Sequence, residues 1–157
     1  MILGPSFTTH GGASEAVMAE IISGQFLGIF DVKLPVVDVR DAAQAHVNAM
    51  LSKGSNGKRH ICCAASYSIG DIIKAAKDEF SRFGYEVKDG VITPEEANAS
   101  SSTVAKNFVP LVGSDPQLNN ERSRKELGIV YRSLKETVAE MGHSLIKNGA
   151  LPHKLNK

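Results

Sequence analysis

Residues 34–46 read Leu34-Pro35-Val36-Val37-Asp38-Val39-Arg40-Asp41-Ala42-Ala43-Gln44-Ala45-His46, a short apolar run that leads into a helix-forming segment. The apolar run at 34–39 predicts a buried strand. Asp41 is typical of a helix N-cap, and residues 42–53 follow it with helical spacing of their apolar side chains. We expect the inner face of this helix to consist of four apolar side chains, Ala43, Val47, Met50 and Leu51.

Strand and helix signals alternate on both sides of this joint. Further helices are expected at 14–23, 69–83, 121–127 and 133–147, and a second strand at 58–64. Gly24 suits the end of the first helix, and Ser68 and Asn120 are the expected caps of the second and third. The order strand, helix, strand, helix predicts an α/β fold with a parallel sheet.

The composition is that of an ordinary globular protein. The chain has 157 residues, which suffices for one domain with a core, and 42% of them are hydrophobic. Its 18 basic and 17 acidic side chains leave a net charge of +1, which argues against nucleic acid or an anionic membrane as an obligatory partner. Because the sequence has neither a membrane-spanning apolar run nor a signal-peptide pattern, we expect a cytoplasmic protein with no membrane partner.

Neither the cysteines nor the histidines form a metal or redox motif. Cys62 and Cys63 are adjacent, so a disulfide between them would be strained. We expect two reduced thiols that pack in the interior, and a redox role is the alternative. His46 has no second ligand at the i+3 or i+4 position, so we expect a partly buried structural histidine and no metal site.

Four segments, in their order and spacing, carry a family resemblance. They are Ile2-Leu3-Gly4-Pro5, Val37-Asp38-Val39-Arg40-Asp41 with His46, Gly57-Lys58-Arg59-His60-Ile61, and residues 120–128 followed by Tyr131 and Leu134. Together they resemble the extended short-chain dehydrogenases/reductases of the NAD-dependent epimerase/dehydratase superfamily. The branch they resemble most contains the dihydroflavonol and cinnamoyl-CoA reductases.

The resemblance implies a partial Rossmann-like fold, namely the C-terminal part of a doubly wound parallel sheet with the helical substrate-binding region. Residues 1–157 would form a single partial domain, and the N-terminal dinucleotide-binding half would be absent. The family uses NADP or NAD, and the resemblance places Gly4 and Pro5 at the strand end that passes the nicotinamide. Because the rest of the cofactor site would be missing, we expect no tight cofactor binding by this chain.

By the same resemblance, the loop after Pro5 lines a cleft for a small carbonyl substrate. Phe7 is expected to pack on an apolar ring of the substrate, and Thr8, with Thr9 and His10, to hydrogen-bond its carbonyl group. Arg40 leaves the strand on the face opposite the apolar side chains. It is expected either to border the substrate pocket or to form an ion pair that only stabilises the joint.

The catalytic machinery of the family has no counterpart that we assign here. Tyr131 and Lys135 have the Tyr-x-x-x-Lys spacing, but they lie where the C-terminal helix of the family begins. We therefore expect Tyr131 to pack at the entrance of a helix and Lys135 to lie in solvent. The segment Gly54-Ser55-Asn56-Gly57 ends a helix and enters a strand, which is the reverse of the order that a phosphate site requires.

Three functions fit these observations. The first is the C-terminal substrate-binding portion of an NAD(P)-dependent oxidoreductase acting on a carbonyl or CH–OH group, inactive as an isolated chain. The second is a non-enzymatic interaction or regulatory module that pairs through its exposed half-sheet, as a homodimer or with a partner chain. The third is a small independent enzyme that uses Tyr131 and Lys135.

Overall fold

A sheet with the strand order β1–β2–β3 lies at the centre of the computed structural model, which describes residues 1–8 and 11–154. β1 (Ile2–Leu3) is parallel to β2 (Lys33–Asp38), with Leu3 opposite Asp38, and β2 is antiparallel to β3 (Ala65–Ser68). The α/β class is confirmed. The strand expected at 34–39 is confirmed as well, within the uncertainty of strand ends.

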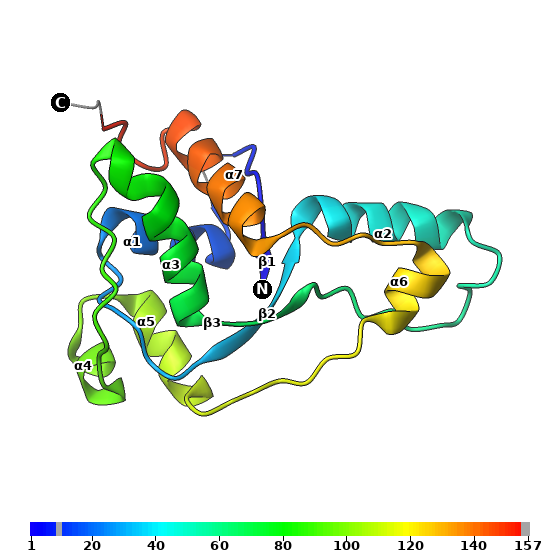
Figure 1. Ribbon diagram of the computed structural model, residues 1–157, viewed down its shortest axis with the longest axis horizontal. Helices are drawn as coiled ribbons and strands as arrows, with labels where there is room; N and C mark the ends of the chain where they lie inside the picture. Colours follow the sequence, from blue (N-terminus) through cyan, green and yellow to red (C-terminus); the bar gives the residue numbers. More distant parts are fainter. Residues whose placement is uncertain (9–10, 155–157) are drawn as a thin grey trace.

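The second expected strand differs from the structure in place and in direction. Residues 58–63 join no ladder, and the third strand of the sheet is β3, which follows them and is antiparallel to β2. In Figure 1, α2 (Val39–Leu51) continues away from the end of β2 instead of folding back over the sheet. The chain therefore returns to the sheet at the same end at which it left β2, so the next strand runs antiparallel to β2. A parallel neighbour would require the chain to cross to the opposite end of the sheet first.

The helices form two groups in Figure 1: α1, α3 and α7 pack against one another beside the sheet, and α2 and α6 lie together at the opposite end of the molecule. Besides α2, the helices are α1 (Ala13–Ser23), α3 (Ile69–Phe80), α4 (Pro94–Ala99), α5 (Thr103–Phe108), α6 (Glu121–Leu127) and α7 (Leu134–Lys147), with the short 3-10 helices η1 (Ser81–Phe83) and η2 (Val109–Leu111). The four helices expected besides α2 are thus confirmed. Within residues 1–8 and 11–154, no helix has the length and apolar character needed to cross a bilayer.

The helix ends follow local chemistry with one exception. Ser68 caps α3 by accepting a hydrogen bond from the Asp71 amide at 3.0 Å, and Gly24 ends α1 with a left-handed φ of 78°. Asn120 occupies the N-cap position of α6 as expected, but its side chain makes no capping hydrogen bond, and the side chain of Asn119 accepts from the Glu121 amide at 2.8 Å. Asn120 instead donates to the Cys63 carbonyl at 2.6 Å and holds α6 against the segment before β3.

The expected cap of α2 is wrong, since Asp38 rather than Asp41 occupies that position. Asp38 ends β2 with extended backbone, and its Oδ1 accepts from the Arg40 amide at 2.8 Å. Asp41 lies in the first turn of the helix and accepts from the Arg132 amide at 2.8 Å, with an ion pair to the Arg132 guanidinium. Because the helix begins directly at the end of the strand, Asp41 is free to tie α2 to the segment before α7.

The interior consists of one large and one small cluster. The large cluster joins α1, α3 and α7 through fully buried side chains that include Met18, Ile22, Ile72, Ile73, Phe80, Met141 and Leu145. The small cluster lies between α2 and α6 and contains Ala45, Leu127 and Ile129. Both cysteines are free, as predicted; Cys63 is buried and Cys62 is half-buried beside the small cluster.

The predicted inner face of α2 lies on the outside. Met50 is 82% exposed, Leu51 74% and Val47 47%, whereas Ala45 and Asp41 are the buried side chains of this helix. The periodicity of the apolar residues is real, but the large side chains point away from α6. We refer to Ala43, Val47, Met50 and Leu51 as the α2 stripe.

Candidate functional site

A cleft of about 300 Å³ lies at the carboxyl end of β1, where the chain turns at Gly4 and Pro5. Its other walls are the first turn of α1, the start of α2 at Val39, and Met141 of α7. Gly4 has a φ of 127°, and a Cβ atom there would lie 2.8 Å from Cγ1 of Val39, so only glycine fits. The structure thus brings the two predicted cofactor contacts, Gly4 and Pro5, into a hollow.

Hydrogen bonds from two helices hold the loop that continues this wall. The Ser6 amide donates to Oγ of Ser144 at 2.8 Å, and the Asn148 side chain donates to the Ser6 carbonyl at 2.7 Å. On the other side, the Ser6 hydroxyl donates to Oε1 of Glu15 at 2.6 Å. Residues 4–6 are therefore fixed between α1 and α7 and form a rigid side of the cleft.

The predicted substrate contacts Phe7 and Thr8 follow this fixed wall. The Phe7 side chain is 93% exposed. Thr8 borders a neighbouring shallow hollow together with Gly11 and Glu15. Thr9 and His10, which we also expected to contact a substrate, lie outside the described residues. Contact of Phe7 and Thr8 with a substrate stays a prediction.

Half-buried Arg40 forms an ion pair with the buried carboxylate of Asp38 at the joint between β2 and α2. Its Nε and Nη2 atoms donate to the two carboxylate oxygens of Asp38 at 2.9 and 2.8 Å, and Nη1 pairs with Glu140. Thr137 adds a hydrogen bond to Asp38 at 2.8 Å from α7. Burial alone would raise the pKa of Asp38, but the hydrogen bonds from Arg40 and Thr137 hold it below its usual value. The hydrogen bond to Asp38 likewise raises the pKa of Arg40, which stays charged.

This ion pair places Arg40 apart from the cleft. Arg40 lines a groove with Gln44, Gly128 and Arg132, whereas Gly4 and Pro5 line the hollow at β1. The alternative role that we considered for Arg40, an ion pair that stabilises the joint, matches this geometry. Its contact with a substrate stays a prediction.

The environments of Tyr131 and Lys135 favour structural roles. Tyr131 precedes α7, and its hydroxyl forms a hydrogen bond of 2.7 Å with Ser123, while Lys135 is exposed. Burial raises the pKa of Tyr131, which is opposite to the lowered pKa that a phenol needs for acid–base work near neutral pH. The guanidinium of Arg124 lies 4.8 Å from the centre of the Tyr131 ring and packs on its face.

The N-termini of α1, α2 and α3 do not match the pyrophosphate site of a dinucleotide. Such a site needs the free N–H groups of a helix N-terminus that follows a strand. The N-termini of α1, α2 and α3 are each capped by a carboxylate of their own, from Glu15, Asp38 and Asp71 respectively. A second negative charge at any of these positions would be repelled.

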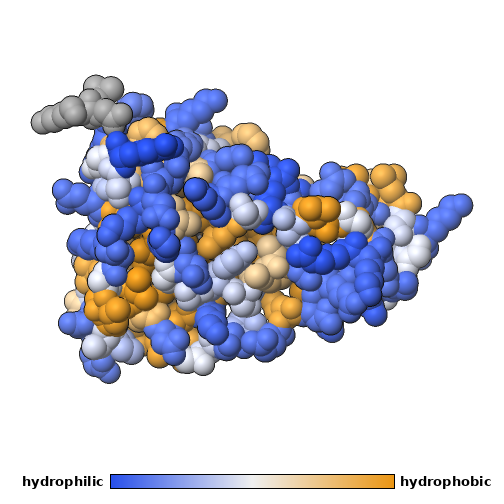
Figure 2. Space-filling view, in the orientation of Figure 1, coloured by the Kyte–Doolittle hydropathy of each residue, from blue (hydrophilic) through white to orange (hydrophobic). Residues whose placement is uncertain are grey.

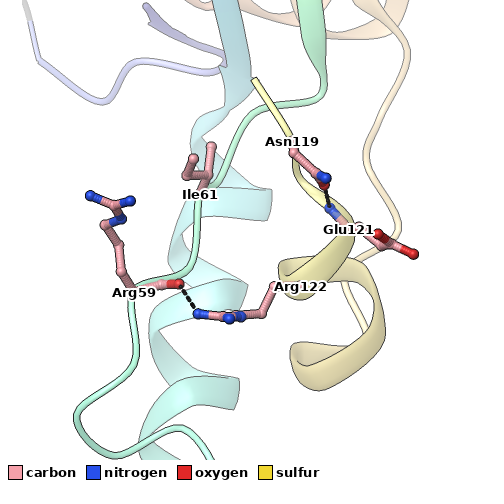
Figure 3. A pocket seen from close by; sticks show the side chains of 5 residues that line it. All are labelled: Arg59, Ile61, Asn119, Glu121 and Arg122. Carbon is pink, nitrogen blue, oxygen red and sulfur yellow. Dashed lines mark hydrogen bonds between the residues drawn. The ribbon is translucent and has the colours of Figure 1, made fainter. Parts of the chain in front are cut away.

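A further hollow, of about 330 Å³, was missed by the sequence interpretation. Figure 3 shows it between the segment at Arg59 and Ile61 and the start of α6, where Asn119, Glu121 and Arg122 lie. Arg122 donates to the Arg59 carbonyl at 3.2 Å, so its guanidinium braces the wall of the hollow. The basic run Lys58-Arg59-His60 was the only signal for it in the sequence.

His46 and the other candidate ligands do not assemble a metal site. Nδ1 of His46 lies 2.7 Å from the Ala42 carbonyl of its own helix, and the ring is exposed rather than partly buried as expected. Over the residues that the structure describes, no three His, Cys, Asp or Glu side chains come together as metal ligands.

Sequence comparison relates the chain to oxidoreductases, although no protein-family model matches it. It is 26% identical over 111 residues to the NADPH-dependent methylglyoxal reductase Gre2 of Saccharomyces cerevisiae, which covers 71% of this chain and 29% of that protein. It is 30% identical over 115 residues to an uncharacterised oxidoreductase of Schizosaccharomyces pombe, covering 73% of this chain and 29% of the relative. The chain thus spans less than a third of the curated relatives it matches.

Solved structures agree with these sequence relatives in fold. The structure of gox2253 superposes with a TM-score of 0.74 at 17% identity, over 96% of this chain and 48% of that one. Yeast methylglyoxal/isovaleraldehyde reductase Gre2 in complex with NADPH gives 0.66 at 22% identity, over 96% and 42%. Vestitone reductase from alfalfa gives 0.63 at 16% identity, over 96% and 43%. The sequence relatives and the structural neighbours alike come from the superfamily of short-chain dehydrogenases/reductases and NAD-dependent epimerases/dehydratases, and the fold of this chain matches a part of their length.

Proposed function

We propose that this chain forms the substrate-side part of an NADPH-dependent reductase of small carbonyl compounds. The names of its relatives support the reaction class, since one of them is a methylglyoxal reductase that uses NADPH. The observation that carries the proposal is the cleft at Gly4 and Pro5, whose walls come from β1, α1, α2 and α7. Because the nearby helix N-termini are capped by carboxylates, the cofactor is to be held by polypeptide outside the described residues.

The residues around the cleft take different parts in this proposal. Gly4 and Pro5 form the wall on the cofactor side. Phe7 offers an exposed apolar ring, and Thr8 offers a hydroxyl group as a hydrogen-bond partner for a carbonyl oxygen. Arg40 acts through Asp38 and holds α2 against α7, because a direct contact with substrate would require its guanidinium to leave two hydrogen bonds.

A chimeric enzyme tests this function. The chain replaces the matching part of yeast methylglyoxal reductase, and NADPH oxidation is followed with methylglyoxal and with isovaleraldehyde. We expect turnover of at least one compound. The matched control carries Phe7→Ala, which removes the exposed ring proposed to pack on the substrate and is expected to lower turnover while NADPH still binds.

Cofactor binding by the isolated chain is the second measurement. Titration of NADPH, followed by its fluorescence, is expected to give no saturable binding, whereas the chimera saturates. Micromolar binding of NADPH to the isolated chain would refute our proposal that polypeptide outside the described residues holds the cofactor. A folded chimera that binds NADPH and reduces neither aldehyde would refute the assigned reaction.

A second candidate function is the non-enzymatic interaction module. The observation that favours it is the exposed α2 stripe, because soluble proteins seldom leave a row of large apolar side chains in water. An isolated chain that forms a dimer through this stripe, together with a chimera that has no reductase activity, would favour this module over the reductase.

A further inference from the structure

The sequence contains two Asn-Gly pairs, Asn56-Gly57 and Asn148-Gly149, and the fold surrounds them differently. In such a pair the backbone nitrogen of the glycine can attack the side-chain amide of the asparagine, because glycine has no Cβ atom to hinder the approach. Asparagine is accordingly one of the thermolabile residues of proteins. The rate at which each pair reacts depends on how freely its two amide groups can move.

Hydrogen bonds fix the pair Asn148-Gly149 at the end of α7. The side-chain nitrogen of Asn148, which is the leaving group of the reaction, donates to the Ser6 carbonyl at 2.7 Å. The Gly149 amide, which is the attacking group, donates to the Ile146 carbonyl at 3.1 Å. Both hydrogen bonds must open before the two groups can meet, and the side chain of Asn148 is half-buried.

The pair Asn56-Gly57 lies in an exposed turn that follows α2. The Lys58 amide closes this turn by donating to the Ser55 carbonyl at 3.0 Å, and Gly57 has a left-handed φ of 70°. Both residues of the pair are exposed, and a Cβ atom at Gly57 would meet nothing within 4 Å. Within residues 1–8 and 11–154, neither the Asn56 side chain nor the Gly57 amide has a hydrogen-bond partner.

The position of this turn gives water access to it. In Figure 1, the turn after α2 lies at the tip of the lobe that α2 and α6 form. In Figure 2, the same lobe is narrow and projects away from the helical body. The buried hydroxyl of Ser55 donates to the Ser52 carbonyl at 2.9 Å, which holds the base of the turn and leaves the two residues at its tip free.

We propose that Asn56 is a site of spontaneous deamidation and that the fold protects Asn148 from the same reaction. The Gly57 nitrogen bonds to Cγ of Asn56, the bond between Cγ and Nδ2 breaks, and Nδ2 leaves as ammonia with the proton of the Gly57 amide. Water then opens the cyclic imide at either of its two carbonyl carbons, which yields aspartate or isoaspartate without a change of oxidation state. This inference is independent of the proposed function, because the reaction needs no cofactor, substrate or partner.

The product changes both the charge and the backbone of the turn. One new carboxylate takes the formal net charge of the chain from +1 to 0. Isoaspartate adds one carbon atom to the main chain between Ser55 and Lys58, so it is expected to displace the hydrogen bond that closes the turn.

Peptide mapping of the aged chain tests the proposal. The full chain is kept folded in mildly alkaline buffer for several weeks, a second sample is kept in concentrated guanidinium chloride, and both are digested with trypsin. Cleavage after lysine separates the two pairs into residues 54–58 and 148–154, and mass spectrometry measures the fraction of each peptide in which an acid replaces the amide. A digest of the fresh chain corrects for deamidation during handling.

In the folded chain, we expect deamidation at Asn148 to be slower than at Asn56 by about tenfold or more, because two hydrogen bonds must open first. In guanidinium chloride the two rates should be comparable. Asn56→Gln is the matched variant, because glutamine keeps an exposed amide but must close a larger ring to react. On isoelectric focusing, the aged parent chain should gain an acidic species with the charge of Asn56→Asp, and the aged Asn56→Gln chain should lack it.

Two results would overturn the proposal. The first is an Asn56 that stays intact in the folded chain or reacts no faster there than Asn148. The second is an Asn148 that remains slower to the same extent in guanidinium chloride, since the local sequence rather than the fold would then account for the difference.

Discussion

Replacing Asp38 by Asn is the sharpest perturbation of the joint between β2 and α2. The carboxylate is buried and accepts four hydrogen bonds, three of them from Arg40 and one from Thr137. The amide keeps the size of the side chain but turns one acceptor into a donor that faces another donor. It also removes the charge that offsets Arg40.

The expected cost is about 3 kcal/mol of unfolding free energy. Removing one partner of a buried ion pair costs roughly 3–5 kcal/mol, and the lower end applies here because Arg40 keeps Glu140. For a chain of this length the melting temperature should fall by about 6–12 °C. Urea unfolding followed by circular dichroism measures the change in unfolding free energy directly. An m-value equal to that of the parent chain would show that the two unfolding transitions can be compared.

The matched control is Asp115→Asn, which breaks the exposed pair that Asp115 forms with Lys33 at 2.6 Å. Exposed pairs contribute about 0.2–1 kcal/mol, so this variant should remain close to the parent chain. If Asp38→Asn were no more destabilising than Asp115→Asn, the ion pair with Arg40 would not stabilise the joint as we argue.

Three further outcomes follow from the packing and the titrating groups. In urea titrations, Gly142→Ala should lower the free energy of unfolding by about 1–2 kcal/mol, because the new Cβ would lie 2.2 Å from Cζ of Phe80. Gly70→Ala is the control: the nearest atom to its new Cβ is 3.3 Å away, so the free energy of unfolding should change by less than about 1 kcal/mol. Because the folded-state pKa of Asp38 is lowered, the stabilisation by its carboxylate is present above about pH 4 and is lost as the pH falls through the folded-state pKa. Between pH 6 and pH 3, the free energy of unfolding should therefore fall less for Asp38→Asn than for the parent chain, as measured by urea unfolding at both pH values. Tyr131→Phe should cost about 1 kcal/mol through the lost hydroxyl hydrogen bond and leave aldehyde reduction by the chimera unchanged; a large loss of turnover would restore a catalytic role for this tyrosine.

The sequence supported the local elements well and their partners poorly. Helix bounds and several caps, such as Ser68 at α3, follow from interactions among residues a few positions apart. The prediction of Asp41 as the cap of α2 failed, because Asp38 suits that position as well and only the end of the buried strand decides where the helix begins. The direction of β3 failed for a related reason, since it depends on where α2 runs after it leaves the sheet.

The candidate site shows the same division. Gly4 and Pro5 were expected at the strand end that passes the nicotinamide; the structure places a cleft at this strand end, and their contact with a cofactor stays a prediction. The partner of Arg40 in α7 was not foreseeable, because Glu140 lies 100 positions further along the chain. The exposed α2 stripe was expected to be buried, because periodicity identifies an apolar face without identifying what covers it.

Hydrophobic spacing, capping residues and turn glycines were enough to predict an α/β chain with the helices α1, α2, α3, α6 and α7, because each of these signals acts over one or two helical turns. Tertiary packing alone decided that Asp38 meets Thr137, that Asp41 meets Arg132, and that α2 turns its large side chains outward. These outcomes depend on contacts between residues 79 or more positions apart, and the free energy of such contacts arises only after the elements have packed.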